Sequence, residues 1–280
     1  MITDDQTNFV WFSELLRQKP EYKSFHKQLV ALLHLHNIPY DYLMETNDVW
    51  CRDYLPVQVS SDKFVDFSYN PEYRHVSGPL KTYADLVCEL MGRKAIKSDI
   101  VLDGSQVIKG ENFVILTGNV LEENKPRYTF DRLTGQLTEL FEVEKVITIP
   151  CVGEEFGCRG TIRWLGQNHV LIGGFGTKND FPTKRSVIKA LEENGLNFSE
   201  FTLTRHHPDQ NLSSAYLAYL YMENLLIVPQ FGLAEDQEAL RQFRMLFPVH
   251  AAKNQIETLD VSAFKQKGGM INDLSWNIRV

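Results

Sequence analysis

Apolar and polar residues alternate in four stretches of the chain, and a short polar turn interrupts each stretch. The four are "VQVSSDKFVDFSY" (57–69), "QVIKGENFVILTG" (106–118), "TIRWLGQNHVLIGG" (161–174) and "AYLYMENLLIVPQF" (218–231). A period of two places successive side chains on opposite faces of a strand, and a polar turn between two such runs is typical of a β-hairpin. The pattern therefore predicts four hairpins.

Each predicted hairpin is followed by apolar residues three or four positions apart, which is the spacing of one helix face. The sets are Leu80, Tyr83, Leu86, Val87 and Leu90; Phe130, Leu133, Leu137 and Leu140; Val187, Ile188 and Leu191; and Leu240, Phe243 and Leu246. The sequence thus repeats a ββα unit four times.

The two ends of the chain are predicted to share a fifth unit. The C-terminal strand in "GGMINDLSWNIRV" supplies one part, and the helix "YKSFHKQLVALLHLH" with the strand "IPYDYLM" supplies the rest. Such a split unit favours a closed ring in which every repeat buries its apolar face against a neighbour. Because no Gly/Ser-rich or Pro-rich linker divides the chain, we expect residues 1–280 to form a single α/β domain.

Composition excludes several classes of protein. Of 280 residues, 43% are hydrophobic and 23% are charged, which is typical of a folded globular chain. The net charge of −7 argues against a nucleic-acid partner. The acidic start "MITDDQTNFVWF" is unlike a signal peptide, and no apolar run reaches membrane-spanning length, so we expect a cytoplasmic protein without a membrane partner. The cysteines Cys51, Cys88, Cys151 and Cys158 form no CxxC pair and are expected to pack as small apolar residues.

Three ionisable residues stand at the same distance from three predicted turns. With turn centres at positions 61, 111 and 167, each of Asp53, Asp103 and Arg159 lies eight residues before its turn. Equivalent places in the repeats of a ring face one axis, so the sequence predicts a charged central cleft.

The densest polar and aromatic cluster is "TNDVWCRDYLPVQV" (46–59). Asp53 beside the aromatic wall of Trp50 would suit a planar cation such as guanidinium, with Arg52 bracing the loop. Alternatively, Trp50 and Tyr54 belong to the core and Arg52 pairs with Asp53 where a strand begins. Asp103 precedes a glycine, which is typical of a turn, but its register with Asp53 favours a cleft with paired carboxylates.

Four motifs together resemble the agmatine deiminases: "NDVWCRDYLPV", "LDGSQVIKG…VILT", "FGCRGTIRW" and "GGMINDLSWNI". The bacterial-type peptidylarginine deiminases, in the same pentein superfamily of guanidino-group-modifying enzymes, share this layout. The similarity extends from Trp11 to Val280. It implies a five-bladed α/β propeller of pseudo-fivefold ββαβ modules, which agrees with the repeat pattern.

The resemblance also implies a chemistry. In such enzymes a Cys thiolate attacks the guanidinium carbon, ammonia leaves, and a His activates water to hydrolyse the thiouronium intermediate. Acidic side chains hold the guanidinium nitrogens, and no metal or organic cofactor is implied. Asp53, with Trp50 beside it, matches the acid of the first motif. Asp103 matches the acid of the second motif, where relatives usually have Gly-Asn in place of Ser105-Gln106.

The third and fourth motifs depart from the family pattern. In an ungapped alignment Gly157 takes the place of the catalytic His and Arg159 that of a clamping Asp. A one-residue gap would put Cys158 and Gly160 there, so neither register restores the pair. Asp273 stands where relatives carry the nucleophilic Cys.

Arg159 suggests a specific hypothesis: its guanidinium occupies the cleft and pairs with Asp53 and Asp103 as a tethered mimic of substrate. Three functions remain open. The chain is a degenerate deiminase homologue acting through binding of a guanidino or amino compound, an active relative or another protein. Alternatively, it hydrolyses agmatine or another guanidino compound through rewired residues, or it is a non-catalytic protein-interaction module.

Overall fold

The computed structural model describes residues 1–69, 81–150, 160–175, 181–204, 212–264 and 269–280. The hypotheses on Gly157, Cys158 and Arg159 fall outside these residues, as do Leu80 and Cys151 of the patterns above. Asp53, Asp103 and Asp273 all lie within them.

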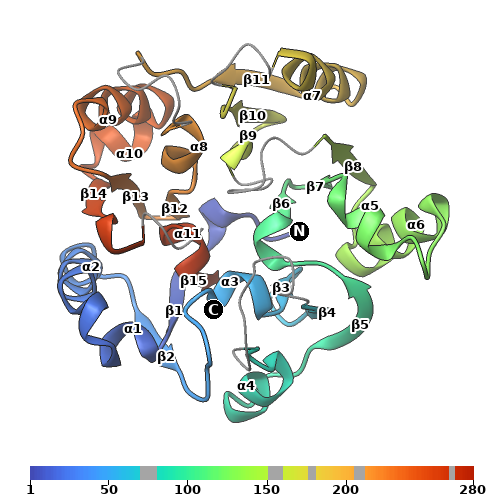
Figure 1. The fold of residues 1–280 in the computed structure, drawn as a ribbon, viewed down its shortest axis with the longest axis horizontal. Coiled ribbons are helices and arrows are strands. Elements are labelled where there is room, and N and C mark those ends of the chain that lie inside the picture. Colours follow the sequence, from blue (N-terminus) through green and yellow to red (C-terminus); the bar gives the residue numbers. More distant parts are fainter. Residues whose placement is uncertain (70–80, 151–159, 176–180, 205–211, 265–268) are drawn as a thin grey trace.

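Five three-stranded sheets surround a common axis like the blades of a propeller (Figure 1). In each sheet an inner strand pairs antiparallel with a middle strand, and the middle strand pairs parallel with an outer strand. A helix connects the middle strand to the outer one, as a parallel pair requires. The five-bladed architecture of ββαβ modules predicted from the sequence is therefore confirmed.

The four modules inside the chain follow one another around the ring. They comprise β3 (Val57–Gln58), β4 (Phe64–Ser68), α4 (Ala84–Leu90) and β5 (Ile96–Val101); β6 (Ile108–Lys109), β7 (Phe113–Thr117), α5 (Asn119–Asn124), α6 (Phe130–Phe141) and β8 (Lys145–Ile149); β9 (Ile162–Gly166), β10 (His169–Ile172), α7 (Phe181–Glu193) and β11 (Asn197–Glu200); and β12 (Leu220–Met222), β13 (Leu225–Gln230), α9 (Glu235–Leu246), α10 (Pro248–Ala252) and β14 (Ile256–Asp260). All four predicted hairpins are present.

The fifth module joins the two ends of the chain, as predicted. It comprises β15 (Ser275–Ile278), β1 (Phe9–Ser13), α1 (Leu15–Gln18), the 3₁₀ turn η2 (Pro20–Tyr22), α2 (Lys23–Leu35) and β2 (Tyr40–Leu43). Strand β15 pairs antiparallel with β1, with Trp276 opposite Trp11, and β1 pairs parallel with β2. The sequence analysis missed β1, because Trp11 and Phe12 lie in an apolar run without a clear period of two.

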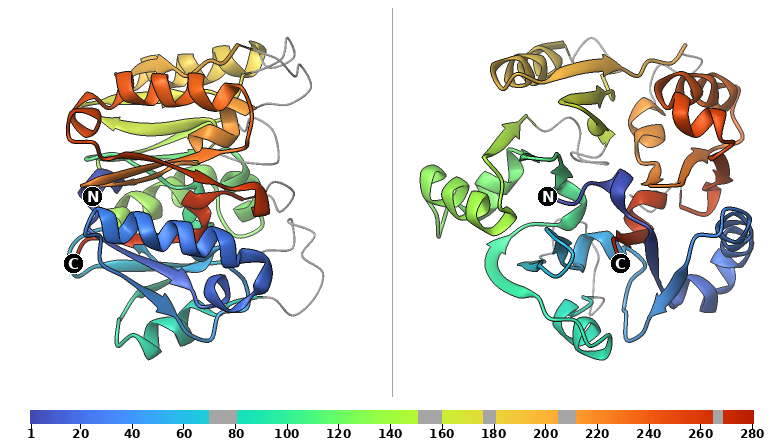
Figure 2. Two further views of the ribbon diagram at one scale, coloured as in Figure 1. Left: turned by 90° about the vertical axis from the view of Figure 1, so that its left-hand side faces the viewer. Right: turned by 180° about the vertical axis from the view of Figure 1, so that it is seen from behind.

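The helices that connect middle and outer strands cover the outside of the ring (Figure 2). Leu133 and Leu137 of α6 and Val187 and Leu191 of α7 are buried as the spacing predicts. Helix α4 is different: Val87 is buried, but Tyr83, Leu86 and Leu90 of the predicted apolar face are exposed. In the described part of the chain no helix has the length and apolarity needed to cross a membrane.

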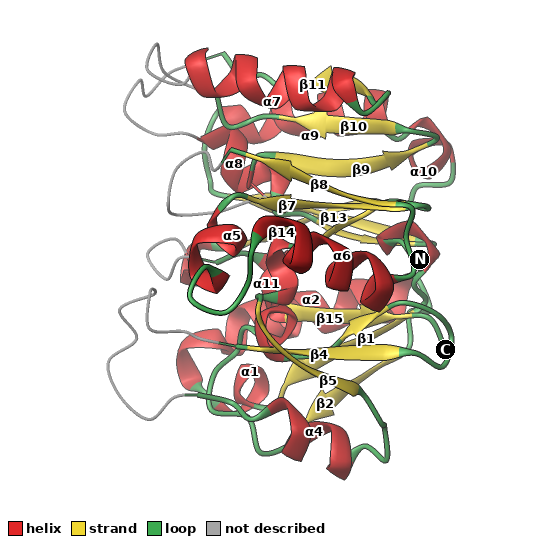
Figure 3. Cartoon of the chain, turned by 90° about the vertical axis from the view of Figure 1, so that its right-hand side faces the viewer, coloured by secondary structure: helices red, strands yellow, loops and turns green. Residues whose placement is uncertain are grey.

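Short helical turns lead into the inner strands. They are α3 (Cys51–Tyr54) before β3, the 3₁₀ turn η4 (Gly104–Gln106) before β6, α8 (Leu212–Leu217) before β12 and α11 (Ile271–Leu274) before β15. The hairpin turns lie at the other end of these strands. Seen edge-on, both termini lie at one side of the ring, with α5 and α8 toward the opposite side (Figure 3). Asp53 and Asp273 therefore belong to helical turns, whereas the sequence suggested extended strand at both places.

Candidate functional site

The turn α3 and the turn η4 of the next module touch at their backbones. A Cβ atom at Gly104 would lie 2.2 Å from the carbonyl oxygen of Arg52, so only glycine permits this approach. Asp53 follows Arg52 in the chain and Asp103 precedes Gly104, and each is 2% exposed. The matched register seen in the sequence therefore corresponds to a real contact between the elements that carry the two carboxylates.

The side chain of Arg52 holds the turn α11 against the turn α3. Its Nε donates a hydrogen bond of 2.8 Å to the carbonyl oxygen of Asn272, and its Nη2 donates to Oδ1 of Asn277 in β15. The carboxylate partner of Arg52 is Asp4, at 3.5 Å, rather than its chain neighbour Asp53. These bonds agree with the expectation that Arg52 braces the loop, and α3, which carries Arg52, contacts both α11 and η4.

Asp273 is fully buried at the start of β15 and closes its own turn. Its Oδ2 accepts a hydrogen bond of 2.7 Å from the backbone N–H of Met270, and its own N–H donates to the carbonyl oxygen of Met270 at 2.9 Å. This is a capping arrangement, in which a side-chain oxygen satisfies a backbone donor that the short helix leaves over. One oxygen of the Asp273 carboxylate is thus engaged by the backbone.

Trp50 lies beside these turns as part of the largest hydrophobic cluster. Its ring contacts Phe264 edge-to-face, with 5.8 Å between centroids, and a Cβ atom at Gly269 would come within 2.5 Å of it. The side chain is 9% exposed. Trp50 therefore packs α3 against the segment that precedes α11, as the core interpretation of this residue expected.

The cysteines of the described chain are poorly suited to nucleophilic chemistry. Cys51 is buried, its Sγ accepts a hydrogen bond of 3.4 Å from the hydroxyl of Tyr54, and burial raises the pKa of its thiol to about 12. Burial likewise raises the pKa of Cys88 to about 12. Both pack as small apolar residues, as expected. Over the same described ranges, no group of three or more His, Cys, Asp or Glu could hold a metal ion.

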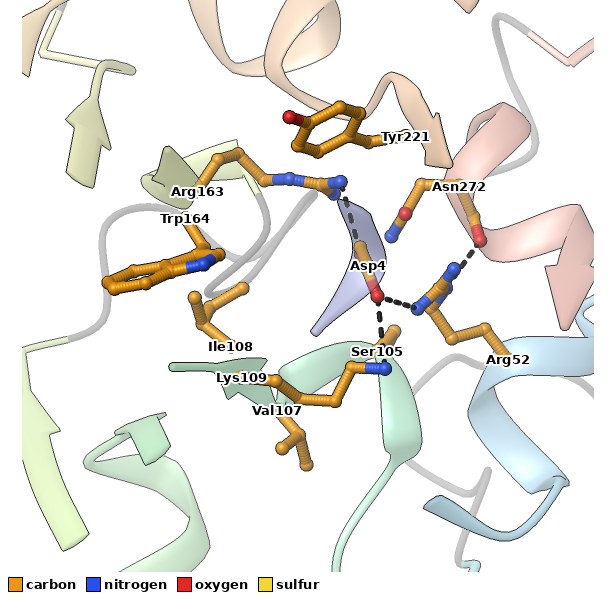
Figure 4. Close-up of a pocket in the computed structure, with 10 residues that line it drawn as sticks. All are labelled: Asp4, Arg52, Ser105, Val107, Ile108, Lys109, Arg163, Trp164, Tyr221 and Asn272. Carbon is orange, nitrogen blue, oxygen red and sulfur yellow. Dashed lines mark hydrogen bonds and ion pairs between the residues drawn. The ribbon is translucent and has the colours of Figure 1, made fainter. Parts of the chain in front are cut away.

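A buried ionic cluster on the ring axis was not anticipated from the sequence (Figure 4). The carboxylate of Asp4, in the 3₁₀ turn η1 (Asp4–Gln6), lies 3.1 Å from Nζ of Lys109 and 3.5 Å from the guanidinium groups of both Arg52 and Arg163. The three cations are each less than a tenth exposed. The available signal was that Lys109 and Arg163 interrupt the apolar pattern of two inner strands, β6 and β9.

Burial and mutual charge interactions shift the pKa values of Asp4, Lys109 and Arg52 in this cluster. Burial opposes ionisation of Asp4, but the nearby charges of Lys109, Arg52 and Arg163 outweigh it and hold the pKa of Asp4 well below its usual range. Burial lowers the pKa values of Lys109 and Arg52, against the pull of Asp4. The axis of the ring is therefore polar and charged.

A closed ring of five ββαβ modules is the architecture of the pentein fold. The chain belongs to the Porphyromonas-type peptidyl-arginine deiminase family, whose model matches residues 13–278.

Individual relatives agree with this assignment. A Mycoplasma mycoides subsp. mycoides SC protein named "Putative agmatine deiminase" is 24% identical, in a match that covers 82% of this chain and 74% of the relative. A Cys-to-Ser variant of C. jejuni agmatine deiminase with substrate bound has a similar fold, at a TM-score of 0.77 and 15% identity, covering 99% of this chain and 95% of the other. Agmatine deiminase of Enterococcus faecalis gives a TM-score of 0.76 at 16% identity, covering 99% and 94%.

Proposed function

We propose that this chain is a catalytically degenerate member of its family that acts through binding rather than through hydrolysis of guanidines. The observation that carries the proposal is Asp273. It stands where the resemblance places the nucleophilic Cys, and its Oδ2 is bound to the backbone N–H of Met270 at 2.7 Å. Here the residue caps a turn, which is a structural task.

The chemistry of a carboxylate supports the same conclusion. Attack by Asp273 on a guanidinium carbon would give an acyl-guanidine in place of a thiouronium, and Gly157 supplies no base at the family's His position. Cys51, the thiol nearest in sequence to Asp53, is protonated at neutral pH because its pKa is about 12. Losing several members of one catalytic unit costs many orders of magnitude in rate.

The retained carboxylates would then serve binding. We propose that Asp53 and Asp103 hold a guanidinium, supplied by Arg159 of this chain or by a guanidino or amino compound. With Arg159 in place, free agmatine is expected to bind weakly, and Arg159→Asp is expected to open the cleft to it. Tight binding of agmatine to the unmodified chain, measured by calorimetry, would contradict the tethered form of the proposal.

Ammonia release from agmatine, arginine and peptidyl-arginine tests the loss of catalysis. The unmodified chain is expected to give no turnover above background, and the triple variant Gly157→His, Arg159→Asp, Asp273→Cys is expected to gain it. The single variant Asp273→Cys is the control, since a thiol without the His should restore little. Full activity of the unmodified chain would overturn the proposal and favour a rewired hydrolase.

If both the chain and the triple variant are inactive, the next question is what the chain binds. Native mass spectrometry after pull-down then separates the remaining alternatives. A small guanidino ligand, an active deiminase relative and another protein each give a distinct added mass. Recovery of a bare monomer from every condition would argue against a role through binding.

A further inference from the structure

The buried ionic cluster borders a pocket on the ring axis, between the N-terminal turn η1 and the turn α11 (Figure 4). Its polar lining includes Asp4, Arg52, Lys109, Arg163 and Asn272, and the side chains of Ile108 and Trp164 provide apolar walls. The cavity gives the centre of a water-sized molecule about 20 Å³ of space, so it suits only a small ligand. Apolar walls keep the local dielectric low and so strengthen any interaction with the charged groups.

The cations of this pocket have donors to spare. Nζ of Lys109 carries three N–H groups, and its one ion-pair partner within the described residues is Asp4. The guanidinium of Arg163 contacts Asp4 and the carbonyl oxygen of Tyr219 through Nη2, and among the described residues no acceptor contacts its Nε or Nη1. Asp5 and Asp273 act on the cluster from longer range. In direct contact, the three cations share the single carboxylate of Asp4, and their remaining N–H donors suit a bound oxyanion.

Asn272 contributes to the pocket a hydrogen-bond acceptor that is unpaired among the described residues, in contrast to the donors of the cations. The residue is 2% exposed, and its side-chain amide points toward Asp4 and Arg163 in the pocket (Figure 4). Oδ1 of Asn272 has no hydrogen-bond partner in the described part of the chain. A buried acceptor left unpaired costs about 1–3 kcal/mol, so a ligand that donates a hydrogen bond would be favoured here. The carboxylate of Asp4 is paired with Lys109, Arg52 and Arg163, and it would repel an oxyanion oxygen that carries no hydrogen.

We propose that this axial pocket is a binding site for a small oxyanion that still carries an O–H group, such as hydrogen phosphate or bicarbonate. Lys109 and Arg163 donate to the anion, and its O–H donates to Asn272 Oδ1 or to the carboxylate of Asp4. A fully deprotonated oxyanion such as sulfate meets the cations equally well but places a lone pair against both acceptors. The proposed anion site does not use the carboxylates of Asp53 and Asp103. The proposal therefore does not rest on the proposed function.

Calorimetric titration of the full chain tests this selectivity. Inorganic phosphate and bicarbonate are titrated at neutral pH in chloride buffer, with sulfate and nitrate at matched ionic strength. We expect saturable binding of at least one protonated oxyanion at one per chain, and an affinity for sulfate lower by about 10- to 100-fold. Equal affinity for sulfate, or no saturable binding of phosphate or bicarbonate, would overturn the proposal. The comparison of phosphate with bicarbonate identifies which anion the pocket fits.

Three variants locate the site. Lys109→Gln removes a charged donor and is expected to weaken binding by about 10- to 100-fold, whereas Lys253→Gln, at an exposed lysine, should leave it unchanged. Asp4→Asn replaces the acceptor carboxylate and is expected to admit sulfate, which a merely structural role of Asp4 would not do. Unchanged phosphate affinity in folded Lys109→Gln would contradict the assignment. If that variant does not fold, the selectivity of the unmodified chain decides.

Discussion

The backbone at Gly104 lies so close to Arg52 that a Cβ atom there would come within 2.2 Å of the Arg52 carbonyl oxygen. The neighbour in this contact is backbone, which cannot swing away as a flexible side chain can. The contact joins consecutive modules of the ring and sets Asp53 and Asp103 on adjoining turns. An Asp-Gly pair that looks like an ordinary turn in the sequence is thus a position where the fold requires glycine.

Replacing Gly104 with alanine is therefore expected to destabilise the protein. The overpacked Cβ atom would push α3 and η4 apart, at a cost of about 1–3 kcal/mol in the free energy of unfolding. Chemical denaturation measures the change. Gly135→Ala is the matched control: Gly135 lies in the middle of α6 with nothing near its Cβ position, so alanine should stabilise by about 0.5–1 kcal/mol. Equal effects at the two glycines would contradict the role of the contact.

Arg52→Lys is expected to be costly although it conserves charge. A single ammonium group cannot reproduce the separate bonds from Nε to the carbonyl oxygen of Asn272 and from Nη2 to Asn277. Because these are charge-assisted and buried, we expect a loss of about 3 kcal/mol, with faster amide exchange in 271–278. Denaturation and hydrogen exchange measure both, and Arg241→Lys at an exposed position should change stability by less than about 0.5 kcal/mol. A tolerated Arg52→Lys would show that Arg52 does not fasten α11.

Cys51 and Cys88 are expected to resist alkylation in the folded protein. Burial raises the pKa of each thiol to about 12, so the reactive thiolate at pH 8 is about a thousandfold scarcer than for an ordinary cysteine. Labelling with iodoacetamide, read site by site by mass spectrometry, should leave both unmodified until denaturant is added. Rapid labelling of native Cys51 would make it a candidate nucleophile and weaken the proposed loss of catalysis.

The ring could be predicted from the sequence because the pattern of apolar and polar residues repeats from module to module. Hairpins and helix faces recur at module spacing, and closure of the ring by the two ends of the chain followed from the split fifth unit, although β1 itself was missed. The equivalent places of Asp53 and Asp103 could be predicted for the same reason, since a shared offset from the hairpin turns reflects equivalent positions in successive modules. What repeats along the chain can be recognised without coordinates.

Contacts between segments far apart in the sequence could not be predicted from periodicity. The capping bond from Met270 to Asp273 depends on a one-turn helix, α11, too short to show any period. Asp4 reaches Lys109 and Arg163 only because the N-terminal turn crosses the ring, at sequence separations of 105 and 159 residues. In the sequence, Asp4 and Asp5 indicated only that the segment is acidic. A lysine and an arginine within apolar strands were the remaining clue, and a partner could not be named from it.

Acid should selectively weaken the contribution of Asp4 to stability. Its pKa in the folded protein lies well below the value near 3.9 expected when unfolded, because Lys109, Arg52 and Arg163 outweigh the opposing effect of burial. A depressed carboxylate pKa contributes stability that is fully present above the unfolded pKa and is lost as the pH falls toward the folded one. Asp4→Asn should therefore cost about 3 kcal/mol at pH 7, and its difference from the unmodified protein should shrink as the pH falls from about 5 to 2. Denaturation across this range measures the difference, with exposed Asp131→Asn, expected to change stability by less than about 0.5 kcal/mol at pH 7, as the control. A difference that stays constant with pH would show that the charge of Asp4 is not what holds the N-terminal turn on the ring axis.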